Sequence, residues 1–185
     1  MILGLDLATS TGICYGDGAS IPVVYAKRMP STGKDVGAFL VDFWMHLDPL
    51  LEKIKPRVVV FEAPIFPAAK VDKETGELLT GAQNIHTMRK LMGLAGLVEM
   101  ACAFRAIDCR EVALSTVKKE LGGHGRASKA DMMFAARRAG IELAEGDEAE
   151  DEADAFGVWL TGIRNHAPQH SLEWDRRIYG GVRRR

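Results

Sequence analysis

The segment MILGLDLATSTGICYGD, residues 1–17, predicts a β-hairpin that carries one acidic residue in an otherwise apolar strand. Residues 1–7 form the apolar strand, residues 9–12 (TSTG) turn the chain, and residues 12–15 (GICY) are its expected partner strand. Asp6 then lies near the end of the first strand. A carboxylate pressed against a hydrophobic core is costly unless a cation offsets its charge. Asp6 therefore marks a candidate functional site.

Two more segments place acidic residues at the ends of elements that bury an apolar side. Residues 57–61 (RVVVF) form a β-branched run without alternation, as expected of a strand covered on both faces, and Glu62 follows it. Asp151 and Asp154 open the stretch 151–163 (DEADAFGVWLTGI), where a spacing of three puts both carboxylates on one face of the first helical turn. Because four such acids come from three distant segments, a shared divalent metal is the first hypothesis.

The rest of the chain predicts an α/β domain. The expected strands cover residues 1–8, 12–17, 21–29, 57–61 and 109–114, and the expected helices cover residues 36–54, 83–104, 116–121, 129–139 and 150–163. The order is βββαβαβα with one extra short helix, which predicts a mixed five-stranded sheet, three antiparallel strands and then two parallel ones, flanked by helices. Residues 67–82 lie outside this framework. Their turn signal at 73–76 predicts a protruding hairpin or mobile loop over the candidate site, or else a tolerated surface insertion.

Length and composition fit one such domain. The chain has 185 residues, of which 47% are hydrophobic and 26% are charged. No apolar run approaches the roughly 18 residues that span a membrane, and the first residues lack a basic leader, so we expect a soluble cytoplasmic protein. Cys14, Cys102 and Cys109 have no CxxC spacing, which argues against a disulfide framework and a zinc site.

Charge is distributed unevenly along a chain whose net charge is −1. Residues 115–138 are rich in Lys and Arg, residues 142–154 contain many acids and no base, and the end of the chain turns basic again. We therefore expect a phosphate-facing stretch at 115–138, a domain over residues 1–163, and a basic, mobile C-terminal tail over residues 164–185. Glu148, Glu150 and Glu152 have the pattern of a solvated acidic linker.

The order of elements and the positions of the acids together resemble the RNase H fold. More narrowly, the chain resembles RuvC-type Holliday junction resolvases, possibly a phage or prophage form. The matching pieces are ILGLDLATSTG, VVVFEAP, LMGLAGLVEMA, STVKKELGGHGRASKADM and DEADAFGVWL, which follow the family's order and cover most of residues 1–163.

This resemblance implies an activity and an acidic site. Asp6, Glu62, Asp151 and Asp154 match the family's acidic tetrad, which holds two Mg²⁺ ions around a phosphodiester and in which Mn²⁺ substitutes. The implied function is paired hydrolysis of phosphodiester bonds in Holliday junctions or other branched DNA, in a bacterial or phage-infected cell. The implied assembly is a homodimer, with the small residues of helix 83–104 allowing close approach.

The resemblance also implies DNA contacts. Lys118 and Lys129 match two basic positions of the family that contact phosphates near the cleavage site and offset charge in the transition state, and Lys119 and Arg126 are nearby substitutes. Phe66 lies one position later than the family's aromatic wedge. Its alternative place is the hydrophobic core.

Other interpretations remain open at this point. Asp151 and Asp154 are also favourable charges at any helix N-terminus. The stretch GLDLATSTG resembles the phosphate-binding opening of actin-like sugar kinases and ATPases, although such proteins need two such domains. A noncatalytic DNA-binding protein and a nuclease acting on RNA–DNA hybrids are the remaining alternatives.

Overall fold

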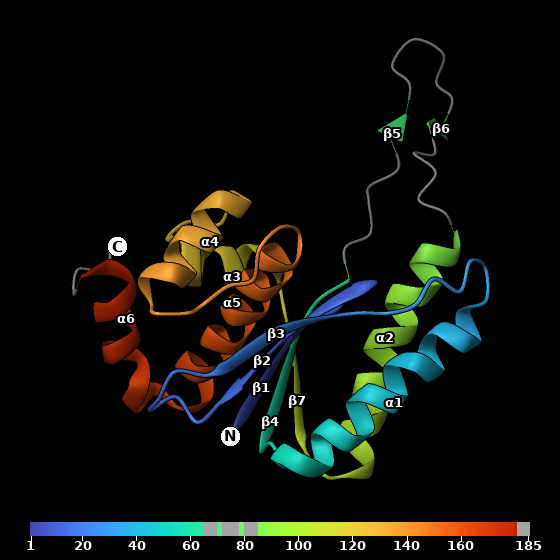
Figure 1. The fold of residues 1–185 in the computed structure, drawn as a ribbon, viewed down its shortest axis with the longest axis horizontal. Coiled ribbons are helices and arrows are strands. Elements are labelled where there is room, and N and C mark those ends of the chain that lie inside the picture. The colour runs from blue at the N-terminus through green and yellow to red at the C-terminus, as the bar shows by residue number, and fades with distance from the viewer. Residues whose placement is uncertain (65–69, 72–77, 80–84, 181–185) are drawn as a thin grey trace.

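The computed structural model describes residues 1–64, 70–71, 78–79 and 85–180, and a five-stranded sheet lies at its centre (Figure 1). The strand order is β3-β2-β1-β4-β7. The strands are β1 (Ile2–Asp6), β2 (Ser10–Gly16), β3 (Val23–Arg28), β4 (Val58–Glu62) and β7 (Asp108–Val112). β1, β2 and β3 pair antiparallel, whereas β4 runs parallel to both β1 and β7. The predicted mixed sheet is therefore confirmed.

Helices cover both faces of this sheet and create two cores. α1 (Val36–Ile54) and α2 (Ile85–Phe104) lie on one face, and α3 (Leu114–Gly122), α4 (Lys129–Arg138) and α5 (Glu148–His166) lie on the other (Figure 1). The side chains of β1 and β4 alternate between them: Leu3 and Leu5 pack under α1 and α2, while Ile2 and Val60 pack under α5. No helix in the described ranges is long and apolar enough to cross a membrane.

Two glycines let α5 lie directly on the sheet. A Cβ atom added to Gly12 would lie 2.0 Å from the carbonyl oxygen of Asp151, and one added to Gly4 would lie 2.5 Å from the backbone nitrogen of Trp159. Contacts this short leave room only for hydrogen, so β1 and β2 pack against the helix backbone itself. Along the same helix Ala155, Val158 and Trp159 are fully buried, as the apolar pattern predicts.

The predicted mobile tail is wrong for residues 164–180. Residue 164 lies inside α5, and the chain continues through a 3₁₀ turn (Pro168–His170) into α6 (Ser171–Tyr179). Trp174 and Ile178, spaced by four on one face of α6, are buried in the core beneath α5. The indole of Trp174 also donates to the carbonyl of Gly18 at 2.9 Å. Two buried apolar residues are therefore enough to pack this short, highly charged helix against the core.

The segment after Glu62 contains the predicted hairpin pairing. β5 (Lys70–Val71) and β6 (Leu78–Leu79) pair antiparallel, with Val71 opposite Leu78. Figure 1 shows this pair away from the five-stranded sheet. Phe66 and the remaining positions of 67–82 lie outside the described residues, so the predicted role of Phe66 stays a prediction.

The close packing at Gly12 predicts a large effect of one methyl group. Gly12→Ala should lower the free energy of unfolding by about 1–3 kcal/mol, because its Cβ meets backbone atoms that cannot rotate away. Urea denaturation of the variant and the parent measures this change. Gly37→Ala in the first turn of α1 is the control, since its Cβ would meet nothing closer than 3.5 Å. Equal stability of both variants with the parent would contradict this packing.

Candidate active site

Two parallel strands deliver Asp6 and Glu62 to the same edge of the sheet. Asp6 ends β1 and Glu62 ends β4, and the register pairs Leu5 with Phe61 immediately before them. Because Ile2 on β1 and Val60 on β4 face α5, the alternation of the strands turns Asp6 and Glu62 toward α5 as well. The carboxyl ends of β1 and β4 thus present two half-buried carboxylates to the helix above them.

The first turn of α5 brings the other two acids to this edge. Gly12 is the pairing partner of Asp6 in the β1–β2 ladder, and it is also the residue on which the backbone of Asp151 rests. Asp151 and Asp154 are half-buried on the helix that covers this spot. The structure therefore brings together all four acids that the sequence analysis singled out.

The electrostatics of these acids show that they form one group. Burial raises the pKa of Asp6 well above its usual range, and the charges of Glu62, Asp154 and Asp151 raise it further. Burial, with a contribution from Asp154, raises the pKa of Glu62 to about 7. Burial likewise raises the pKa of Asp154 to about 6 against the opposing effect of two lysines. The site is therefore short of positive charge.

Lys118 and Lys129 are the two lysines that act on this group. Lys118 lowers the pKa of Glu62 and of Asp154, and Lys129 lowers that of Asp6 and of Asp154. Lys129 is exposed and forms an ion pair with Glu150, which raises the lysine's own pKa. The structure thus places both predicted lysines beside the acids.

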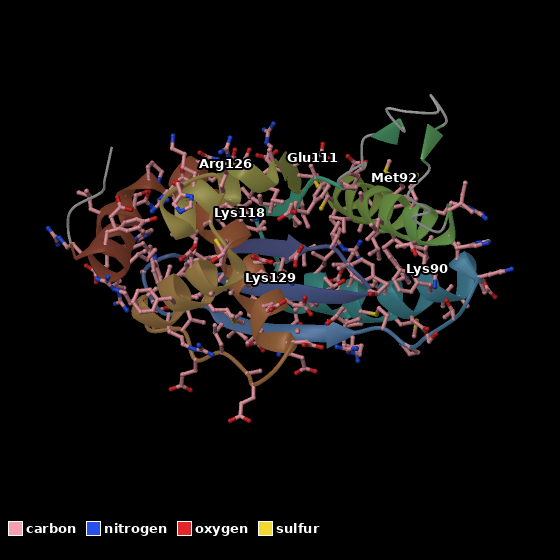
Figure 2. All side chains as sticks on the ribbon, turned by 90° about the horizontal axis from the view of Figure 1, so that it is seen from above. Lys90, Met92, Glu111, Lys118, Arg126 and Lys129 are labelled. Carbon is pink, nitrogen blue, oxygen red and sulfur yellow. The ribbon has the colours of Figure 1, made fainter. Side chains whose placement is uncertain are left out.

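The predicted basic residues are arranged around the helical layer on this side of the sheet. Lys118 lies on α3, Lys129 begins α4, and Arg126 lies in the connection between these two helices (Figure 2). Lys119 and Arg126 are exposed, as a phosphate contact requires, whereas Lys118 is half-buried. Their contacts with DNA stay predictions.

One residue near the site was missed from sequence, and three acids were misassigned. The hydroxyl of Ser10, at the start of β2, is buried and has no hydrogen-bond partner within the described ranges. Glu148, Glu150 and Glu152 all belong to α5, so their assignment to a linker was wrong, although Glu148 is exposed to solvent as expected. Glu152 is only 6% exposed and accepts a hydrogen bond of 2.7 Å from the amide of Ala144. The position of Glu152 on the helix distinguishes it from its solvated neighbours. It lies four residues before buried Phe156 and therefore on the same, inward face of α5.

The donor set fits a hard divalent cation. All four acids offer carboxylate oxygens, the ligands that Mg²⁺ and Mn²⁺ prefer. The raised pKa values of Asp6, Glu62 and Asp154 indicate that added positive charge is favourable there. No group of three or more His, Cys, Asp or Glu side chains in the described part of the chain is arranged closely enough to hold a metal as it stands. The carboxylates therefore share an electrostatic field without forming a tight coordination shell.

Sequence comparison relates the chain to named nucleases, although no known family model matches it. It is 25% identical over 130 residues to the crossover junction endodeoxyribonuclease RuvC of Prochlorococcus marinus, which covers 70% of this chain and 72% of that protein. It is 33% identical over 75 residues to the RuvC of Corynebacterium jeikeium, covering 40% of this chain and 45% of that protein.

Solved structures share the fold over most of their length. The RuvC of Thermus thermophilus matches with a TM-score of 0.60 at 19% identity, covering 90% of this chain and 96% of that one. The same protein in complex with a Holliday junction substrate matches with a TM-score of 0.64 at 17% identity, covering 94% and 96%. The yeast mitochondrial Holliday junction resolvase Ydc2 matches with a TM-score of 0.61 at 10% identity, covering 95% and 83%.

The mixed sheet with helices on both faces matches the RNase H-like fold of the RuvC structures. Among proteins with this fold, the relatives in sequence and in structure are RuvC proteins and a Holliday junction resolvase. The predicted resemblance to RuvC-type resolvases is therefore confirmed. A phage or prophage origin stays a prediction.

The raised pKa of Glu62 predicts a pH-dependent stability difference. A carboxyl whose pKa rises on folding stabilises the fold while it is protonated, and this contribution is lost as the pH rises from the unfolded value of about 4.5 through about 7. In EDTA, Glu62→Gln should therefore gain stability relative to the parent across this window, by on the order of 1–3 kcal/mol. Denaturation at a series of pH values measures the difference. Exposed Glu145→Gln is the control, and a flat Glu62→Gln difference would contradict burial of this charge.

Proposed function

We propose that the chain is a metal-dependent, structure-selective endonuclease that resolves Holliday junctions and related branched DNA by hydrolysing phosphodiester bonds. The observation that carries this proposal is the electrostatic coupling of Asp6, Glu62, Asp151 and Asp154 at one edge of the sheet. It occurs in a fold shared with RuvC, whose structure with a Holliday junction substrate is known. The similarity to RuvC sequences supports the same substrate class.

In this proposal the four acids hold two Mg²⁺ ions, for which Mn²⁺ can substitute. Bound metal would supply the charge that the site lacks and would stabilise negative charge on a phosphodiester. Asp6 and Glu62 are fixed by the sheet, whereas Asp151 and Asp154 are fixed by the start of α5. Rigid elements thus carry both halves of the ligand set, which favours a reproducible geometry.

Lys118 and Lys129 contact phosphates beside the acids in this scheme. Lys118 is half-buried and already influences Glu62 and Asp154, so it is suited to the phosphate nearest the reaction. Lys129 is held by Glu150. A phosphate must compete with this carboxylate, so binding of DNA would release Glu150 to solvent. Lys119 and Arg126 would contact the strand further away, and Phe66 would act as the aromatic wedge.

A homodimer matches the near two-fold symmetry of a four-way junction and would supply two cuts in the correct relation. The outer side of α2 supports this assembly. Ile85, Met92 and Met100 are exposed there, and a Cβ on Gly96 would meet nothing within 4 Å (Figure 2 labels Met92). Gly93, by contrast, packs against Leu40 of the same chain, and Ala95 and Ala101 are buried. Of the small residues predicted for close approach, Gly96 is therefore the one available to a second copy.

The assay that tests the proposed function compares DNA structures. With Mg²⁺, the protein should make paired, symmetric nicks in a synthetic four-way junction and should leave linear duplex and RNA–DNA hybrid intact. Asp6→Asn should lower the cutting rate by at least about 10²-fold, because it removes a ligand of the catalytic metal. Junction binding should be retained, because the variant keeps all the basic side chains that contact phosphates. Gel analysis of end-labelled strands measures both cuts.

The control for this assay is Asp147→Asn, which removes an exposed acid just before α5 and should cut at the parental rate. If the protein cuts only RNA–DNA hybrid, then the hybrid is its substrate and the proposed junction substrate is wrong. Normal cutting by Asp6→Asn would show that the acids are not the active site.

Metal binding should be measurable without any DNA. Mg²⁺ or Mn²⁺ should raise the thermal unfolding midpoint, because the cation relieves repulsion among buried carboxylates that exists in the folded state alone. A stabilisation of about 2–3 kcal/mol is expected at a metal concentration 100-fold above Kd. Scanning calorimetry with and without EDTA measures it. The shift should be largely absent in Asp6→Asn and unchanged in Asp147→Asn, and an equal shift in all three proteins would contradict the proposed ligands.

A further inference from the structure

The ends of α4 and α6 bring four arginines together outside the acidic site. We name this surface the arginine face: Arg137 and Arg138 in the last turn of α4, and Arg176 and Arg177 in the last turn of α6. A Cβ on Gly180, after α6, would lie 3.9 Å from Nη2 of Arg138, and one on Gly140, after α4, would lie 4.0 Å from Nη1 of Arg177. The two helix ends therefore meet at Arg138 and Arg177, and Arg137 and Arg176 are their neighbours in sequence.

This face has a surplus of positive charge. Arg177 pairs with Glu173 at 3.1 Å. Two acids on the same helices are also engaged, since Asp131 accepts hydrogen bonds from Ser128 and Asp175 pairs with Arg164. Arg137, Arg138 and Arg176 are exposed, and none of them forms an ion pair within the described part of the chain. A helix C-terminus favours such cations but does not neutralise them.

An exposed aromatic residue accompanies these charges. Phe134 on α4 is 64% exposed, and the guanidinium of Arg138 lies 5.9 Å from the centre of its ring. Phe134 and Arg138 also border a shallow cavity of about 170 Å³, whose wall includes Tyr179 of α6. An exposed phenylalanine among unpaired arginines is typical of surfaces that bind nucleic acid.

Helix α4 links the arginine face to the candidate active site. α4 begins at Lys129, beside the acids, and Arg137 follows eight residues later on the exposed side of the helix. This is a rise of about 12 Å along the helix. Duplex DNA rises by about 3.4 Å for each base pair, so α4 spans three to four base pairs of an arm that leaves the site.

We propose that the arginine face binds the phosphate backbone of one duplex arm of the branched substrate, several base pairs from the scissile phosphate. This inference rests on the proposed function and adds a second contact region to it. α6 takes part because Trp174 and Ile178 fix it to the core, so the arginines of α6 are held at a constant position relative to α4. The contact contributes affinity for junctions with long arms and does not take part in the cleavage step.

The test measures binding in EDTA, where no cutting is expected, to junctions with long arms and to junctions trimmed to a few base pairs per arm. Arg137→Gln with Arg138→Gln should weaken binding of the long-armed junction and reduce the slope of log K against log salt by about 2, because each lost phosphate contact changes it by about 0.9. Adding Arg176→Gln should reduce it further. Binding of the trimmed junction in EDTA, and its cutting in a separate assay with Mg²⁺, should be unchanged.

The matched control is Lys53→Gln with Lys55→Gln, which removes two exposed lysines at the end of α1, at the opposite end of the sheet from Asp6. This control variant should have the parental slope of log K against log salt for the long-armed and for the trimmed junction. If the arginine variant behaves like this control, the face does not bind DNA and is available to an acidic protein partner instead. Equal losses on long and trimmed junctions would also overturn the assignment to an arm. Failure of the proposed function would be seen separately, as a parental protein that does not bind junctions at all.

Discussion

The packing of α5 directly on β1 and β2 is the constraint on which the rest of the structure depends. It exists because Gly4 and Gly12 have no side chain where the helix backbone passes. The same contact that closes the core also sets the position of Asp151 above the strand that carries Asp6. Two small residues in the first hairpin therefore determine the geometry of a site whose other half lies about 140 residues further along the chain.

This arrangement has an energetic cost that the core must offset. Burial and the neighbouring carboxylates raise the pKa values of Asp6, Glu62 and Asp154, and two lysines compensate only in part. The compensating stability comes from the apolar part of α5 and from α6. The rings of Phe156, Trp159 and Trp174 pack together there, with centroids 5.2 to 5.8 Å apart. A buried aromatic cluster of this kind fixes the helix strongly enough to hold an electrostatically unfavourable first turn.

Much of this fold and site could be predicted from the sequence because the signals were local. The boundaries of α1 match the predicted residues 36–54, since the apolar spacing and Pro56 define that helix without reference to the rest of the chain. The four acids were identifiable because each lies at the beginning or the end of an element with an apolar side. α6 was missed because Trp174 and Ile178 are few among many charges, and their burial depends on a surface that α5 and β2 create together. Glu152 was misassigned because a buried and a solvated glutamate look alike until helical phase is known.

A buried network around Arg164 explains how the basic regions on separate helices keep a constant distance from the acids. Arg164 on α5 is almost fully buried and forms ion pairs with Glu120 on α3 and Asp175 on α6. The hydroxyl of Tyr179 adds hydrogen bonds of 2.9 and 3.0 Å to the carbonyls of Glu120 and Leu121. Breaking a buried charge network by removing one partner costs about 3–5 kcal/mol, so these three helices resist separation. Lys118 lies on α3, Asp151 and Asp154 lie on α5, and the four arginines lie on α4 and α6. Because α3, α5 and α6 are tied together, a DNA backbone bound across them, as we propose, would keep a fixed distance from the scissile bond. A fixed distance of this kind would favour a branched substrate over a linear one.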